Sequence, residues 1–136
     1  MSRLFLVGLA LTASGLDACA PGLPEPISPR AAMRFDAELT GLVPGRPQNC
    51  LPLRSTANVV AARGRTLLFR EGRMVFANET SGGCAALVDQ SYAMLTENFG
   101  GGALCRGTLA KVVDLQSRGI IRGSCVLGEF TPYRRP

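Results

Sequence analysis

The sequence predicts a small, mainly β domain, either an antiparallel β-barrel or a bent sheet, stapled by two disulfides. Three observations predict this class. Between residues 58 and 131 the apolar side chains recur mostly with a period of two, which is typical of β-strands. Glycine-rich breaks divide this region into short segments, as in small β-barrels. Four of the five cysteines lie beyond residue 49, an even number that can form two pairs.

Residues 1–18 are predicted to be a signal peptide. Arg3 supplies a positive charge, and residues 4–13 form an apolar core. A membrane-spanning helix needs roughly 20 apolar residues, so this core is too short to cross a bilayer and suits a secretory signal. We therefore exclude this segment from the predicted fold.

Cys19 follows the predicted signal in a recognisable pattern. Leu16 stands three residues before it, and Ala18 stands immediately before it. This pattern resembles the lipobox of bacterial lipoproteins, which implies that the signal is cut before Cys19 and that Cys19 carries the lipid. Asp17 departs from the family pattern, in which a small uncharged residue is usual. Lipidation of Cys19 would also leave an even number of cysteines to pair.

The same resemblance implies a location. Ala20 rather than an aspartate follows the cysteine, and by the sorting rule of enteric lipoproteins this favours an outer membrane lipoprotein that faces the periplasm. The alternative is ordinary signal-peptidase cleavage after Ala20, which would leave a soluble periplasmic or secreted chain. Pro21 would then follow the cut, and that peptidase tolerates proline badly there.

Residues 19–48 are predicted to form a proline-rich tether that holds the domain away from the bilayer. Prolines interrupt helices and central strands, so such segments tend to be extended spacers. Residues 31–42 could form a short helix or a strand. The alternation of polar and apolar residues over 34–39 favours an extended segment that docks on the domain.

The folded domain is expected at residues 49–136. Residues 58–62 predict a buried strand. Residues 66–69 and 73–78 predict a β-hairpin with its turn near Gly72. Further strands are expected at residues 92–96, 109–115 and 125–131, with glycine-rich breaks at residues 82–83, 100–102, 119 and 123. The helical candidate is a single turn at residues 85–90.

Four cysteines allow three disulfide connectivities. We expect Cys84–Cys105, which would clamp the loop around Tyr92, and Cys50–Cys125, which would tie the first strand to the last. By loop-closure entropy each bond would add about 3–4 kcal/mol, which matters because so small a domain has a small core. Disulfides also indicate an oxidising compartment.

Two cysteine motifs mark the C-terminal two-thirds of the chain. They are Leu-Cys-x-Gly at residues 104–107 and Cys-x-Leu-Gly-x-Phe at residues 125–130. Together with a strand pair that ends in Asn78, they resemble a family of small uncharacterised proteobacterial exported proteins and lipoproteins with a four-cysteine domain. The family motif continues with Asp where Thr108 stands here. A turn or cap would survive this change, because Thr can also bond to nearby backbone. The resemblance implies export and carries no activity.

Several kinds of chemistry are disfavoured. The sequence has no histidine, which removes Ser-His-Asp and Cys-His catalysis and most zinc sites. The cysteines include no Cys-x-x-Cys pair, and the acidic residues lack the spacing of a calcium loop. The glycine run at 100–102 lacks the Gly-Lys-Ser/Thr ending of a phosphate loop. We therefore predict no metal, no cofactor and no enzymatic activity.

The net charge is +5 and comes mostly from arginine. Arg63, Arg65, Arg70 and Arg73 lie around the predicted hairpin, and the guanidinium fork suits phosphates and carboxylates. One hypothesis is a basic surface for lipid phosphates, lipopolysaccharide or an acidic protein. The other is a solvated face that deters edge-to-edge strand pairing. Export and the few aromatic residues argue against nucleic acid.

These observations predict an envelope-tethered, non-enzymatic protein with a binding or structural accessory role. Its partners would be the membrane, through the N-terminal lipid, and an anionic envelope component or a protein. The alternative is an inhibitor of a secreted hydrolase, in which the loop at 92–102 would enter the cleft of the target.

Overall fold

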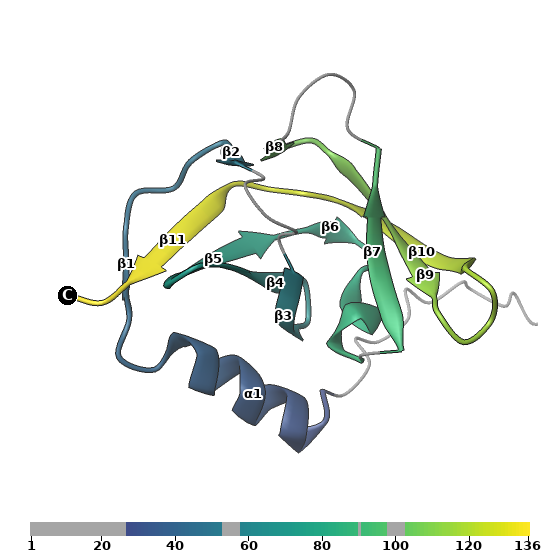
Figure 1. Ribbon diagram of the computed structural model, residues 1–136, viewed down its shortest axis with the longest axis horizontal. Coiled ribbons are helices and arrows are strands. Elements are labelled where there is room, and N and C mark those ends of the chain that lie inside the picture. The colour runs from purple at the N-terminus through teal and green to yellow at the C-terminus, as the bar shows by residue number, and fades with distance from the viewer. Residues whose placement is uncertain (1–26, 53–57, 90, 98–102) are drawn as a thin grey trace, which may run out of the picture.

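The computed structural model describes residues 27–52, 58–89, 91–97 and 103–136. Within these residues the chain is mainly β and antiparallel, and its sheets stay open rather than closing into a barrel (Figure 1). The prediction of a mainly β, disulfide-stapled fold is confirmed, in its bent-sheet form. The elements are α1 (Pro29–Leu39), β1 (Val43–Pro44), β2 (Cys50–Pro52), β3 (Asn58–Arg63), β4 (Thr66–Glu71), β5 (Met74–Glu79), β6 (Ser81–Gly82), η1 (Ala85–Val88), β7 (Tyr92–Thr96), β8 (Ala103–Cys105), β9 (Leu109–Asp114), β10 (Ile120–Val126) and β11 (Phe130–Arg134).

The strands form a five-stranded sheet in the order β1-β11-β5-β4-β3, a four-stranded sheet in the order β6-β10-β9-β7, and the pair β2-β8. Helix α1 covers one face of the five-stranded sheet (Figure 1). The larger core cluster fills the opposite face and includes Phe69, Val112 and Phe130. The smaller cluster lies under α1 and includes Phe35, whose side chain is 4% exposed.

The predicted hairpin is present as β4 and β5, which pair from Thr66 opposite Glu79 to Glu71 opposite Met74. Gly72 makes the turn with a φ of 57°, a conformation that costs glycine nothing. Because both faces of this hairpin are covered, its strands are continuous apolar runs. The predicted strands at 58–62 and 92–96 correspond to β3 and β7, and the predicted single turn corresponds to η1.

The segment expected to be extended at 34–39 is helical, so that prediction is wrong. Ser28 caps α1 by accepting a hydrogen bond from the Ala31 amide at 3.2 Å, and Pro29 stands at the first helical position, which it favours. Phe35 and Leu39 are four residues apart and therefore share one face, which packs on the sheet. The polar–apolar alternation is a by-product of this helical spacing.

Residues 29–48, which the sequence assigns to the tether, pack on the domain. Besides α1, Val43 and Pro44 pair with the last strand β11, and Gln48 bridges to Phe130. The predicted signal peptide, Cys19 and the first part of the tether lie outside the described residues. Within the described residues, no helix is both long enough and apolar enough to cross a membrane.

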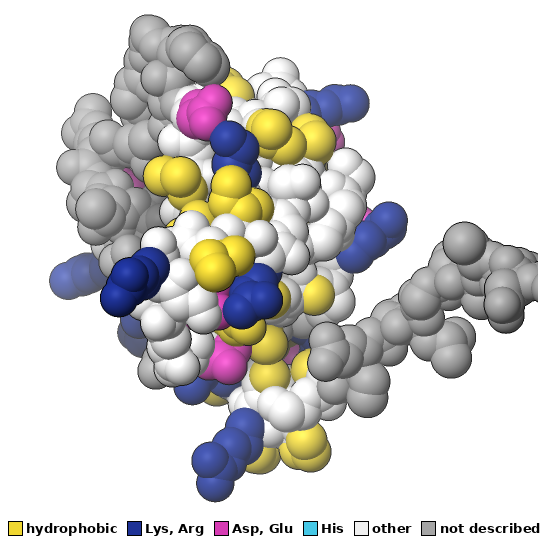
Figure 2. Space-filling model, turned by 90° about the vertical axis from the view of Figure 1, so that its right-hand side faces the viewer, with side chains coloured by type: hydrophobic (Ala, Val, Ile, Leu, Met, Phe, Trp, Pro, Cys, Tyr) yellow, Lys and Arg dark blue, Asp and Glu magenta, His cyan; other side chains and the backbone are white. Residues whose placement is uncertain are grey.

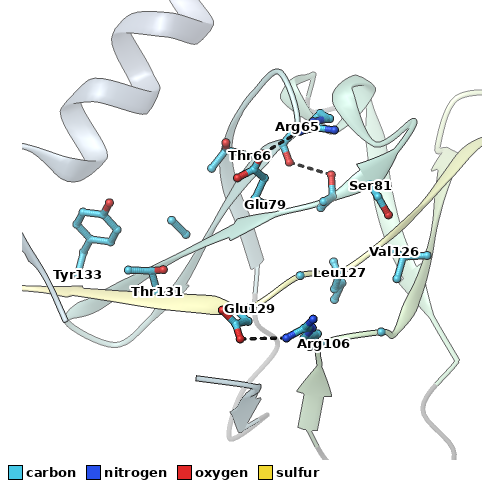
Figure 3. Close-up of a pocket in the computed structure, with 14 residues that line it drawn as sticks. Arg65, Thr66, Glu79, Ser81, Arg106, Val126, Leu127, Glu129, Thr131 and Tyr133 are labelled. Atoms are coloured by element: carbon cyan, nitrogen blue, oxygen red, sulfur yellow. Dashed lines mark hydrogen bonds and ion pairs between the residues drawn. The ribbon is translucent and has the colours of Figure 1, made fainter. Parts of the chain in front are cut away.

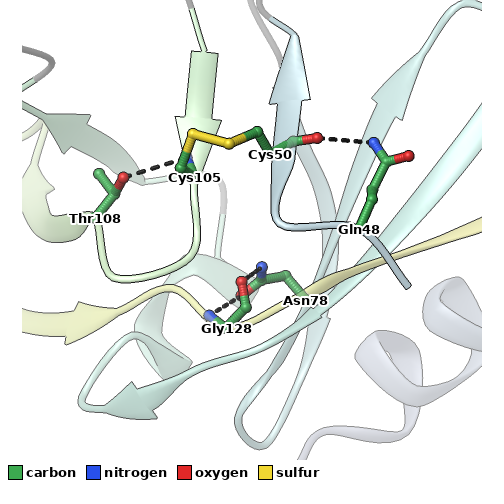
Figure 4. Close-up of a disulfide and its surroundings, with 6 residues drawn as sticks. All are labelled: Gln48, Cys50, Asn78, Cys105, Thr108 and Gly128. Atoms are coloured by element: carbon green, nitrogen blue, oxygen red, sulfur yellow. Dashed lines mark hydrogen bonds between the residues drawn. A yellow bond between two sulfur atoms is a disulfide. The ribbon is translucent and has the colours of Figure 1, made fainter.

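The predicted disulfide pairing is wrong. The structure joins Cys50 to Cys105 and Cys84 to Cys125, rather than Cys50 to Cys125 and Cys84 to Cys105. The cause is strand pairing between distant segments. β2 pairs with β8 so that Cys50 stands opposite Cys105, and Figure 4 shows this bond between the two strands. β6 pairs with β10 so that Cys125 stands opposite Gly82, close to Cys84.

The predicted strand at 125–131 is divided between two sheets. Cys125 and Val126 end β10, and Phe130 and Thr131 begin β11. Between them the backbone of Gly128 lies against the carbonyl of Glu79, where an added Cβ would clash. The glycine therefore permits the crossing between sheets. The break predicted at residue 123 is a bulge inside β10.

Candidate functional site

Three of the four arginines predicted to form a basic surface are paired with carboxylates. Arg63 pairs with Asp36 at 2.8 Å and lies 4.2 Å over the ring of Phe35. Arg65 pairs with Glu79 at 2.9 Å, and Arg70 pairs with Glu38. Two of these pairs fasten α1 to the sheet. Each pair also neutralises a charge that the anionic-surface hypothesis requires.

Arg70 and Arg73 nevertheless line a recess together with the last two arginines of the chain. This basic recess, of about 790 Å³, lies between the C-terminal half of α1, the β4–β5 turn and the end of β11. Its apolar wall is formed by Leu42, Met74 and Val75. Among the described residues, the charged ones that line it are Glu38, Arg70, Arg73, Arg134 and Arg135. Four arginines and one glutamate of the described chain thus line the recess.

A second recess, of about 700 Å³, has balanced charges (Figure 3). Arg65 pairs with Glu79 on one side of it, and Arg106 pairs with Glu129 at 3.1 Å on the other. Both pairs are largely exposed, so their net contribution to stability is small. This recess has no net charge from these four groups, and it provides a natural comparison for the basic one.

The outer face of the four-stranded sheet is aliphatic. Of the ten large apolar side chains that are exposed in the described residues, six lie on this face or at the end of the β9–β10 hairpin: Leu95, Leu109, Leu115, Ile120, Ile121 and Val126. Figure 2 shows hydrophobic and basic side chains interleaved at this end of the molecule. Such an accumulation exceeds the scattered apolar residues of an ordinary surface.

The ion pair in the middle of this face joins Lys111 to Glu97, with a distance of 2.6 Å between Nζ and Oε1. The hydrogen bond and the charge of Lys111 lower the pKa of Glu97 below its ordinary value of 4.5. The pair therefore stays ionised and adds no net charge to the face.

The turn of the β9–β10 hairpin is held by Asp114, which is only 7% exposed. Its Oδ1 accepts hydrogen bonds from the amides of Gln116 and Ser117 at 2.9 and 3.1 Å, and its Oδ2 pairs with Arg122 at 3.1 Å. Burial acts to raise the pKa of Asp114, but the hydrogen bonds from Ser117, Gln116 and Arg122 outweigh it and lower the pKa below its ordinary value of 3.8. The turn is therefore preorganised around a carboxylate.

The cysteine motifs have structural roles in this fold. Leu104 and Leu127 are buried, and Thr108 accepts a hydrogen bond from the Cys105 amide at 3.2 Å (Figure 4). The expectation that threonine could serve as a backbone partner at position 108 is confirmed. Asn78, also drawn in Figure 4, exchanges hydrogen bonds with Gly128 in the second motif.

The loop predicted to enter a hydrolase is only partly described. Residues 92–96 form β7, which pairs with β9 throughout, and Tyr92 and Met94 pack against the core. Residues 98–102 lie outside the described residues. The described part of that segment is therefore a strand of the sheet rather than a projecting loop.

The sequence contains a signal for the aliphatic face, although this face was not predicted. In residues 109–115 and 120–126 apolar side chains occupy both parities of the strand, which indicates that neither face is fully polar. The basic recess had no such signal, because it depends on where α1 docks.

No protein-family model, curated protein or solved structure matches this chain. The resemblance to a family of exported proteins therefore stays a prediction. Two disulfides are typical of proteins in an oxidising environment outside the cytoplasm, and the fold with its two surfaces is the basis for a functional proposal.

Proposed function

We propose that this chain is a non-enzymatic binding protein of the bacterial envelope, tethered to the outer membrane through a lipid on Cys19. Its binding site is the basic recess, and its partner is a phosphate- or carboxylate-bearing component of the envelope. The observation that carries the proposal is that Arg70, Arg73, Arg134 and Arg135 line one recess, in which Glu38 is the only acidic residue among the described lining residues.

The charges of the recess favour an anion. Arg70 is paired with Glu38, whereas no described carboxylate pairs with Arg73, Arg134 or Arg135. Guanidinium groups are more weakly hydrated than ammonium groups and bind phosphate and carboxylate with two parallel hydrogen bonds. The side chains come from the β4–β5 hairpin and the C-terminal end of the chain, so a bound anion would contact both.

The same residues favour binding over catalysis. An arginine side chain remains protonated at any physiological pH, so it stabilises negative charge without exchanging protons. Glu38 is engaged by Arg70 and is not positioned as an independent base. The apolar wall of Leu42 and Val75 would suit an anion that carries a hydrocarbon part, as lipopolysaccharide does.

The test compares two charge-matched double variants of the full chain. Arg73→Glu with Arg134→Glu alters the basic recess, and Arg65→Glu with Arg106→Glu alters the balanced recess. The probes are purified lipopolysaccharide and, as a lipid-free source of phosphate, inorganic polyphosphate. We expect the first variant to lose at least tenfold in affinity for lipopolysaccharide, since each lost contact to a charged group costs about 1.5–3 kcal/mol.

The second variant should bind within about threefold of the parent chain, because its arginines are already paired with carboxylates. Equal losses in both variants would mean that only the overall charge matters, and the proposed site would be wrong. Binding to polyphosphate as tight as to lipopolysaccharide would assign the affinity to phosphate alone and leave no role for the apolar wall.

The anchor is tested separately by the intact mass of the exported chain and of a Cys19→Ser variant. We expect acyl groups on a chain that begins at Cys19, and neither acylation nor membrane retention through the N-terminus in the variant. A chain that begins at Pro21 with no acyl mass would contradict the anchor while leaving the recess untouched.

A further inference from the structure

The aliphatic end of the β9–β10 hairpin is a second surface, separate from the basic recess. Leu115, Ile120 and Ile121 are 60%, 54% and 55% exposed and surround one turn. In Figure 1 this hairpin projects at one end of the long axis, and the C-terminus that borders the basic recess lies at the other. The hairpin and the basic recess are therefore separate surfaces.

The hairpin holds these side chains outward rather than letting them fold back. The Asp114 carboxylate binds two amides of the turn, and the Gly119 amide donates to the carbonyl of Asp114 at 2.9 Å. The Leu115 amide donates to the carbonyl of Ser91 at 2.9 Å, which fastens the turn to the start of β7. The exposure of three aliphatic side chains is thus a fixed property of the fold and not of a loose loop.

Basic side chains accompany the aliphatic ones. Arg118 is exposed within the turn, and Arg122 is half-exposed beside it. The only carboxylate of this hairpin, Asp114, is buried and turned toward the backbone and Arg122. The surface that the tip presents is therefore aliphatic and positive, with its negative charge kept inside.

We infer that the tip of the β9–β10 hairpin inserts into the interface of an anionic lipid bilayer, with Leu115, Ile120 and Ile121 among the upper acyl chains and Arg118 at the phosphates. Aliphatic side chains partition into this region in proportion to the area that they bury, and each nearby arginine adds attraction to an anionic leaflet. Arg122 lies beside the phosphates and keeps its pair with Asp114.

A bilayer fits this tip better than a protein partner does. Three side chains on a convex turn offer little area compared with the roughly 800 Å² per partner that a stable protein interface buries. A bilayer accepts a convex shape without a matching pocket. The course of the chain agrees, since α1 begins on the side of the hairpin and ends on the side of the C-terminus (Figure 1). The described chain thus begins on the side of the hairpin.

The experiment uses the absence of tryptophan from the sequence. Ile120→Trp and Leu115→Trp each introduce a single tryptophan, which can be excited selectively over the two tyrosines, into the full, oxidised chain. Met33→Trp is the matched control, because Met33 on α1 is 63% exposed and Leu115 is 60% exposed. The probes are vesicles of phosphatidylglycerol or of phosphatidylcholine, with and without bromine on the acyl chains. The emission of a tryptophan depends on its immediate surroundings. Binding of a vesicle through the N-terminal apolar segment would therefore not produce the change in emission that insertion of the hairpin produces.

With phosphatidylglycerol vesicles we expect the emission of both hairpin variants to shift to the blue and to be quenched by the brominated chains, while the Met33→Trp variant does not change. Adding Arg118→Glu to Ile120→Trp should weaken partitioning by at least about fivefold, because a basic residue near an anionic surface contributes about 1 kcal/mol. Phosphatidylcholine should bind more weakly than phosphatidylglycerol.

Each contrary outcome overturns the inference. Unchanged emission of both hairpin variants would exclude insertion. Equal quenching of Met33→Trp would show non-specific embedding of the whole chain. A blue shift that grows with protein concentration in the absence of lipid would assign the tip to a contact between copies of this chain. None of these results would affect lipopolysaccharide binding at the basic recess, so the two proposals fail independently.

Discussion

The side-chain amide of Asn78 holds the segment at which the chain crosses from one sheet to the other. Its side chain is 0% exposed, its Nδ2 donates to the carbonyl of Gly128 at 2.9 Å, and its Oδ1 accepts from the amide of Gly128 at the same distance. It therefore satisfies both polar groups of the glycine at which the chain crosses from one sheet to the other. A buried backbone group without a partner costs about as much as a lost hydrogen bond.

Replacing Asn78 with leucine should destabilise the domain by about 3 kcal/mol, because Asn78→Leu keeps the volume but leaves both groups of Gly128 unpaired. The measurement is urea unfolding with the disulfides oxidised, and Asn49→Leu at an exposed position is the control. If the two variants lost similar stability, the amide of Asn78 would have no special role.

Asp114 should make stability depend on pH in the acid range. Since its pKa is lowered on folding, it contributes stability that is fully present above its ordinary value of 3.8 and is lost as the pH falls through the folded value. Asp114→Asn can still accept the amide hydrogen bonds of the turn but cannot titrate. The difference in unfolding free energy between parent and variant should therefore shrink as the pH is lowered from about 5 to 2. Parallel stability curves would contradict this assignment.

Thr108 and Asn78 show which side-chain hydrogen bonds could be predicted from the sequence. Its possible hydrogen bond to nearby backbone follows from its own side chain and from a partner three residues away, and the structure contains that bond. Asn78 stands 50 residues from Gly128, so no local pattern could indicate the interaction. Local hydrogen bonds were predictable, whereas long-range ones were not.

Among the elements, the β4–β5 hairpin was predicted and α1 was not. The hairpin is encoded by two short apolar runs and a turn glycine within one stretch of chain. α1 contains a polar–apolar alternation that is typical of a strand, and its helical signals, Ser28 before Pro29 and the four-residue spacing of Phe35 and Leu39, are weaker on their own. Burial of Phe35 against the sheet favours the helix, and the sequence does not reveal that contact.

The two disulfides should respond differently to reductant. Cys50 is exposed, whereas Cys84 and Cys125 are 1% and 2% exposed. Because thiol exchange requires access to a sulfur, Cys50–Cys105 should open first under mild reduction and Cys84–Cys125 only near global unfolding. Stepwise alkylation followed by mass spectrometry gives the order. Simultaneous opening would contradict it, and a peptide that links Cys50 to Cys125 would contradict the pairing itself.

At the scale of the whole molecule, the two proposed surfaces lie at opposite ends. The basic recess lies beside the C-terminus and the aliphatic hairpin at the opposite end (Figure 1). A molecule that inserted the hairpin into a bilayer would hold the recess away from that bilayer, toward the space that it faces. The two proposals together describe a protein that presents an anion site at a fixed distance from a membrane.

Only part of this arrangement follows from the sequence. Arg70 and Arg73 were predicted to act together and do line one recess, but Arg63 and Arg65 are taken up by carboxylates. Asp36 and Glu38 lie on α1, and this segment was predicted to dock on the domain as an extended chain, so the ion pairs that its helical form makes with the strands could not be predicted. The functional surface was incompletely predicted because it depends on the docking of a helix.

The crossed order of the disulfides along the chain also determines what a single proteolytic cut does to the protein. Cys84 lies between Cys50 and Cys105, and Cys105 lies between Cys84 and Cys125. A single cut at any peptide bond between Cys50 and Cys125 therefore leaves both fragments covalently joined. A nicked chain should keep its full mass on a non-reducing gel and separate only after reduction, and release of a fragment without reduction would contradict this. One hydrolytic event would not detach the hairpin from the rest of the molecule.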